Sequence, residues 1–225
     1  MANIRSEAES KELHRKILTG ATTAFIHKGF EKTTLIDIAK LSGVPKSKIL
    51  YEMNSKEEIL GHLVAKFLDG VTAASDAVST KLTDDKILIF MANEALQIYM
   101  AEMNEDMRNL YLAGYSMPKT SEAVLKRRVN ILFREFGDEL DFELKDFYEL
   151  EIASMGIMRA YMSVPCDIYF TLDAKIDRLV TTMLRIYDMD SEVIEKTKEF
   201  LKKIDFKEIS RNTVENVFKE LGIKG

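Results

Sequence analysis

Two lysines, Lys46 and Lys48, stand two positions apart, directly after a glycine–valine pair and a proline. An ammonium group can donate hydrogen bonds to phosphate oxygens or to the acceptor atoms of guanine in the major groove of a duplex. Backbone N–H groups at helix starts, here near Thr34 and Ser55, also attract phosphate oxygens. The candidate contacts with a nucleic acid are Thr33, Thr34, Pro45, Lys46, Ser47, Lys48, Tyr51 and Lys56.

The surrounding residues predict two short helices joined at a sharp corner. Thr34 can start the first helix, which ends near Ser42. Gly43 permits the turn, and the apolar Val44 packs beneath both helices, as in a helix-turn-helix. The second helix extends through Met53. On that helix we expect Lys46, Ser47, Lys48, Tyr51 and Glu52 to face solvent, and Ile49, Leu50 and Met53 to face inward.

Longer helices flank this corner on both sides. Ser10 can cap a leading helix that stops at Gly29, a usual residue for a left-handed helix end. Ser55 and Glu58 form a capping-box signature before a long apolar helix. This last helix is placed to bridge an N-terminal domain and a C-terminal domain.

The stretch GFEKTTLIDIAKLSGVPKSKILYEMNSKEEIL resembles the N-terminal helix-turn-helix of the TetR family of bacterial transcriptional regulators. The similarity covers about Leu13 to Val64 without a gap. It implies a homodimer whose N-terminal heads contact double-stranded operator DNA. It also implies a C-terminal domain that binds a small-molecule inducer and dimerises through a four-helix bundle.

Four positions depart from the family pattern. Pro45 stands where a serine or threonine is usual, so a hydroxyl cap is missing, although proline is acceptable at a first helical position. Leu50 replaces a common phosphate-binding tyrosine, and Met53 replaces a usual phenylalanine. Glu52 would disfavour a phosphate contact unless it accepts from a cytosine amino group or points away.

Charge is unevenly distributed along the chain. Through Lys66 there are 11 Lys and Arg against 8 Asp and Glu, whereas the remainder has 21 against 29, for an overall charge of −5. A basic head on an acidic body suits a protein that contacts a polyanion at one end only.

The composition favours a helical protein of the cytoplasm. The longest stretch without Asp, Glu, Lys or Arg has 11 residues, from Ile17 to His27, which is too short to cross a bilayer. The first residues lack the apolar run of a signal peptide, and the lone Cys166 cannot form an intrachain disulfide. We therefore expect a cytoplasmic location and no membrane partner.

Hydrophobic periodicity predicts an all-α fold, with a helix-turn-helix domain at 1–54 and a helical ligand-binding and dimerisation domain at 55–225. Further helices are expected from Thr83 and the two aspartates after it to about Met103, from Asn104 or the residues after it, from Ser121 to Phe136 with Gly137 as a stop, from Lys145 to Val164, along Leu172 to Tyr187, and from about Ser191 and Phe206. The helix from Lys145 has two apolar faces, as expected for a helix buried within a domain or against a partner subunit.

Methionines and tyrosines are frequent in the second domain. Flexible thioethers and amphipathic rings suit an adaptable, largely apolar cavity, although for any one residue a place in the core is the favoured interpretation. The candidate ligand contacts are Tyr99, Met103, Met107, Tyr111, Phe133, Met155, Met158, Tyr161 and Met162.

Two other function classes are open to a helical chain of this length. A di-metal helical-bundle enzyme would use Glu-x-x-His pairs, and the sequence contains none. We therefore expect no catalytic residues, no metal site and no cofactor. A protein-interaction adaptor would make the N-terminal cations incidental. The favoured function is a DNA-binding regulator, a repressor released from its operator when a small, largely apolar molecule binds the second domain.

Overall fold

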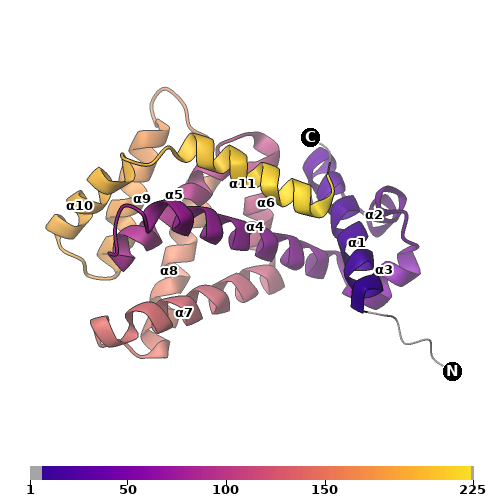
Figure 1. Ribbon diagram of the computed structural model, residues 1–225, viewed down its shortest axis with the longest axis horizontal. Coiled ribbons are helices and arrows are strands. Elements are labelled where there is room, and N and C mark those ends of the chain that lie inside the picture. Colours follow the sequence, from indigo (N-terminus) through magenta and orange to yellow (C-terminus); the bar gives the residue numbers. More distant parts are fainter. Residues whose placement is uncertain (1–6, 224–225) are drawn as a thin grey trace.

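The computed structural model describes residues 7–223, which form eleven helices and contain no strand (Figure 1). The predicted all-α fold is confirmed. The helices are α1 Glu7–Lys28, α2 Leu35–Ser42, α3 Lys46–Met53, α4 Lys56–Ser79, α5 Lys86–Ala101, α6 Glu105–Ser116, α7 Pro118–Leu140, α8 Leu144–Ser163, α9 Leu172–Ile186, α10 Ser191–Leu201 and α11 Phe206–Leu221.

Helices α1 to α3 form a head at one end of the molecule (Figure 1). Its core includes the fully buried Ile17, Ile38 and Ile49. Helices α1 and α2 cross closely at Gly20, where an added Cβ would lie 2.6 Å from the backbone nitrogen of Ser42. A glycine is therefore needed at the crossing, because any side chain would push the two helices apart.

Helix α4 leaves the head and runs through the body, where it packs against α5, α7 and α11. Ser55 caps its first turn by accepting a hydrogen bond from the Glu58 amide at 3.1 Å. Its buried side chains include Leu60, Leu63 and Phe67. The predicted bridging helix is confirmed as a helix, while the boundary between residues 54 and 55 stays a prediction.

Some predicted helix ends were wrong. Helix α1 is already helical at Glu7, three residues before the predicted cap at Ser10. The predicted start of α5 at Thr83 and the two aspartates after it is confirmed, because the Asp85 carboxylate accepts from the amides of Ile87 and Leu88. Gly137 does not stop α7, which continues to Leu140.

Helix α8 has one apolar face that the other described residues leave exposed. Phe147, Met158 and Met162 are fully buried, whereas Leu144, Tyr148 and Ile152 are about half exposed. Burial of α8 on both sides within its own domain, one of the two arrangements expected from the sequence, is therefore not found among residues 7–223.

The crossing at Gly20 gives a stability prediction. Gly20→Ala should destabilise the protein by about 1–3 kcal/mol, because the backbone of Ser42 has to move away from the new methyl group. Urea unfolding followed by circular dichroism measures this change.

Gly61→Ala in α4 is the matched control. Its Cβ would meet only the Thr120 hydroxyl, at 3.8 Å, so the substitution should leave stability unchanged or raise it by about 0.5–1 kcal/mol. Equal stability of the Gly20→Ala variant and the wild type would contradict the close crossing.

Candidate functional site

The corner between α2 and α3 sets the direction of the α3 side chains. Gly43 closes α2 in the left-handed conformation, with φ of 67°, and Val44 is buried beneath the corner. Ile49 and Met53 face the head core, so Lys46, Ser47 and Lys48 project into solvent. The exposed face of α3 continues with Tyr51, whose side chain is 84% exposed.

Two side chains of α3 lie differently from the prediction. Leu50 is 37% exposed and does not face inward. Glu52 is not on the solvent face, because its carboxylate lies 3.2 Å from His14 Nε2 on α1 and is largely buried. The carboxylate that seemed to oppose phosphate binding is therefore turned away from the exposed face of α3.

The first turn of α3 has open backbone donors. Pro45 occupies the N-cap position, one residue before the first helical position predicted for it, and supplies no side-chain cap. Its carbonyl accepts from the amides of Lys48 and Ile49 at 2.9 and 3.0 Å. The amides of Lys46 and Ser47 precede the hydrogen-bonded turns of the helix, so the helix itself offers them no acceptor.

The first turn of α2 is closed by a capping box between Thr34 and Asp37. The Thr34 amide donates to the Asp37 carboxylate at 2.8 Å, and Lys28 pairs with the same carboxylate at 2.7 Å. The bonds from Lys28 and Thr34 hold the pKa of Asp37 well below its ordinary value. Thr34 is exposed at this helix start, close to Lys28, which is already paired with Asp37.

Thr33 and Lys56 close the loop between α1 and α2. Thr33 is 2% exposed, and its hydroxyl donates to the carbonyls of Gly29 and Ala24 at 2.7 and 3.1 Å. This burial does not fit the predicted phosphate contact of the Thr33 side chain. Lys56 Nζ donates to the carbonyls of Phe30 at 2.7 Å, Glu31 at 3.3 Å and Thr33 at 3.0 Å. Lys56 thus ties the start of α4 to the head.

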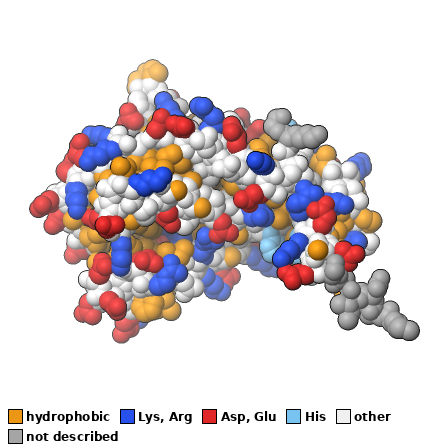
Figure 2. Space-filling view, viewed as in Figure 1, with side chains coloured by type: hydrophobic (Ala, Val, Ile, Leu, Met, Phe, Trp, Pro, Cys, Tyr) orange, Lys and Arg blue, Asp and Glu red, His pale blue; other side chains and the backbone are white. Residues whose placement is uncertain are grey.

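A cavity of about 340 Å³ lies between α4, α5 and α7 in the body. Figure 2 shows apolar side chains in the hollow between α4 and α7. A volume of this size is within the range of small-molecule sites. The apolar lining consists of Leu68, Ile89, Phe90, Ile131, Leu132 and Phe136.

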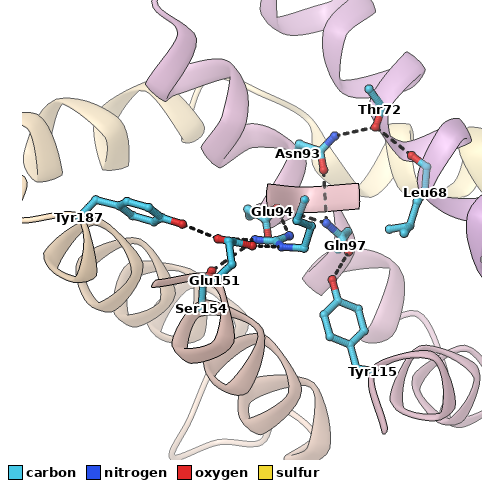
Figure 3. A network of polar contacts seen from close by, with 10 residues as sticks. Leu68, Thr72, Asn93, Glu94, Gln97, Tyr115, Glu151, Ser154 and Tyr187 are labelled. Carbon is cyan, nitrogen blue, oxygen red and sulfur yellow. Dashed lines mark hydrogen bonds and ion pairs between the residues drawn. The ribbon is translucent and has the colours of Figure 1, made fainter. Parts of the chain in front are cut away.

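A buried ionic cluster borders the cavity (Figure 3). Arg128 on α7 donates to Glu94 Oε1 on α5 at 2.6 Å, to Glu151 on α8 and to the Ser154 hydroxyl at 3.3 Å. The Tyr187 hydroxyl donates to Glu151 as well. Burial opposes the charge on Arg128, but Glu151 and Glu94 outweigh this effect and raise its pKa well above the ordinary value.

Glu94 is less completely satisfied than Glu151. Within residues 7–223, its second carboxylate oxygen, Oε2, is buried and has no hydrogen-bond partner. Burial raises the pKa of Glu94, since a buried carboxylate loses its hydration, and nearby Arg128 only partly offsets this cost.

None of the nine methionines and aromatic residues predicted to contact a ligand borders this cavity. Met107, Tyr111, Met155, Met158 and Met162 are buried in the core, and Tyr111 borders only a void of about 10 Å³. Tyr99 stacks on Phe206 at 5.0 Å and Tyr161 lies 6.1 Å from Phe170, while Met103 and Phe133 are exposed.

The residues that do form the cavity carried a weaker signal in the sequence. Glu94 is the only charged residue between Ile87 and Ala101, in the apolar run ILIFMANEALQIYMA. A lone carboxylate in such a run must be exposed or be paired inside the fold. This signal could have identified Glu94, but not its partners on α7 and α8.

Metal-ligand clusters and membrane spans are both missing from the part of the chain that the structure describes. No group of three or more potential metal ligands occurs among its residues. None of its helices is both long and apolar enough to span a bilayer.

A family model described as bacterial regulatory proteins, tetR family, matches residues 17–63. The HTH-type transcriptional regulator TtgR of Pseudomonas putida is 37% identical over 60 residues, which cover 27% of this chain and 29% of that protein. The probable HTH-type transcriptional regulator YttP of Bacillus subtilis is 36% identical over 78 residues, 32% of this chain and 37% of that protein.

The biofilm operon icaADBC HTH-type negative transcriptional regulator IcaR of Staphylococcus epidermidis is 27% identical over 129 residues, 56% of this chain and 65% of that protein. A crystal structure of the TetR family transcriptional regulator PfmR from Thermus thermophilus aligns over 88% of this chain and 95% of that one, with a TM-score of 0.40 and 17% identity. The aligned part spans less than two thirds of each of the three curated relatives.

The segment at 17–63 contains the capped start of α2, the Gly43 corner and the whole of α3. Over this segment the chain matches the TetR family of bacterial regulatory proteins.

Proposed function

We propose that this chain is a cytoplasmic transcriptional repressor that binds operator DNA as a homodimer and releases it when a small molecule occupies the cavity. The observation that carries this proposal is the solvent face of α3, where Lys46, Ser47, Lys48 and Tyr51 project from a tetR-family helix-turn-helix. Repression rather than activation is supported by IcaR, a negative transcriptional regulator that is similar over the longest segment of the three relatives.

In this proposal the first turn of α3 enters the major groove. Lys46 and Lys48 donate to base acceptors or phosphates, and the open amides of the first turn bind a phosphate. Thr34 and Tyr51 contact the flanking backbone. Lys56 acts through the loop that it closes, and the Thr33 side chain takes no direct part, since it is buried.

The exposed face of α8 is the proposed dimer interface. Leu144, Tyr148 and Ile152 follow one another at intervals of four residues, so they form one apolar stripe on the helix. Gly156 continues the stripe, and a Cβ added there would meet no heavy atom of the described residues within 4 Å. A two-fold contact along this stripe would pair two heads, as the two half-sites of an operator require.

Helix α4 is the proposed route from cavity to head. Lys56, the first residue of α4, is hydrogen-bonded to the head, and Leu68, Thr72 and Asp76 further along the helix line the cavity. Leu68 lies twelve residues after Lys56, about 18 Å along the axis. A ligand that favours a tilted α4 would therefore change the separation of the two heads, provided that it binds the two arrangements with different affinity.

The DNA contact is tested with lysine substitutions. Lys46→Ala and Lys48→Ala should each weaken binding to a duplex selected from a random pool. A base contact should cost about 1–3 kcal/mol in a sequence-dependent way, whereas a phosphate contact should lower the salt slope by about one. Fluorescence anisotropy across a range of salt concentrations measures both quantities.

Lys81→Ala is the control for this test, because Lys81 is exposed in the loop after α4, outside the head. It should bind DNA like the wild type. Unchanged affinity in both head variants would remove α3 from the interface and end the proposal.

The dimer contact is tested on α8. Ile152→Asp should convert the dimer into a monomer, because a carboxylate in an apolar interface loses its hydration without gaining a partner. Light scattering after size-exclusion chromatography gives the mass directly. Leu82→Asp is the matched control, since Leu82 is 52% exposed and Ile152 is 54% exposed. A dimer that survives Ile152→Asp would place the interface elsewhere.

A further inference from the structure

The cavity between α4, α5 and α7 combines an apolar wall with an excess of buried negative charge. Glu94, Glu151 and Arg128 are all buried beside it, so two carboxylates share one guanidinium. Glu151 is engaged by Arg128 and by the Tyr187 hydroxyl. Glu94 lines the cavity and accepts from Arg128 through Oε1, whereas its Oε2 has no partner among the described residues.

The α4 side of the cavity also carries an acidic side chain without a cationic partner. Asp76 makes no side-chain hydrogen bond or ion pair with any residue in 7–223, and burial together with Glu135 raises the pKa of its carboxyl. The cations around the cavity are already engaged. Lys86 pairs with Glu139 at 3.0 Å, Arg127 with Asp69 at 2.8 Å and Arg134 with Glu135 at 2.8 Å.

We propose that the ligand of this cavity is a lipophilic cation, an apolar body that carries a protonated amine. The ammonium would pair with the carboxylate of Glu94, which lines the cavity and has one oxygen without a partner among the described residues. It would supply the positive charge that the buried cluster lacks, while the apolar body packs against Phe90, Leu132 and Phe136. An anionic ligand would instead meet these carboxylates, and every cation among the described side chains that line the cavity is already paired. This inference rests on the proposed function, because it names the class of molecule that would trigger release.

Three probes that share one apolar body and differ in charge test which charge the cavity prefers. Phenylbutylamine is cationic at neutral pH, phenylbutanol is neutral and phenylbutyrate is anionic. Calorimetric titration of the full chain should give a Kd for the amine at least about tenfold lower than that for the alcohol, with the carboxylate weakest. Equal affinity of amine and alcohol, tighter binding of the carboxylate, or no saturable binding of the amine would each overturn the proposal.

Substitutions then locate the charge. Glu94→Gln keeps the size of the side chain and removes its charge, so the preference for amine over alcohol should fall to the smaller part that Asp76 supplies. Asp76→Asn, on the α4 side and only partly buried, should reduce the same preference without any change in the buried cluster. Glu199→Gln on α10 is the control and should keep the full preference, because Glu199 is exposed and neither it nor its partner Lys202 lines the cavity. An amine preference retained by both Glu94→Gln and Asp76→Asn would show that the cation binds elsewhere.

DNA binding of the same samples distinguishes this inference from the function on which it rests. If the amine binds with the expected preference but no duplex is bound, the proposed regulator fails and the cation site stands. If a duplex is bound and the amine shows no preference, the cation site fails and the regulator stands.

Discussion

The ammonium of Lys56 holds three carbonyl oxygens of the loop between α1 and α2, and the same residue begins α4. The ammonium also lies 4.2 Å from the centre of the Phe30 ring, so the contact combines hydrogen bonds with a cation–π interaction. A rigid helix fixed in this way at its first residue transmits any change of its tilt to the head. This attachment is therefore one of the contacts that set the position of α3 relative to the body.

The buried cluster around Arg128 imposes a second constraint, on the body. Arg128 on α7 pairs with Glu94 on α5 and with Glu151 on α8, so it links three helices through residues that are far apart in the sequence. Removal of one member of such a buried pair costs about 3–5 kcal/mol, because the remaining charge stays without compensation. The cluster thus holds α5 and α7, two walls of the cavity, in place beside Glu94. One oxygen of this carboxylate, Oε2, has no hydrogen-bond partner among the described residues.

The features that depend on local geometry could be predicted from the sequence. Gly43 at a left-handed position, Val44 beneath the corner and Ser55 at a helix start each have a conformational cause within a few residues.

The orientation of Glu52 was missed, because it is set by His14, which lies 38 positions earlier on another helix. Gly137 was misjudged for a related reason, since tertiary packing of α7 outweighs the weak helix propensity of one glycine. The cavity could not be located either, because methionine and tyrosine at helical spacing suit a core as well as a pocket, and its actual lining depends on how α4, α5 and α7 pack as whole helices.

The last helix makes a further attachment to the head. The carbonyl of Leu221, at the end of α11, accepts from the Thr19 hydroxyl and from Arg15 Nη1, both on α1. The end of α11 therefore holds the head in addition to Lys56, and α1 also packs against α4 and α6 of the body. Attachments to several helices oppose independent swivelling of the head. A displacement of α1 would therefore carry α2 and α3 with it as one unit.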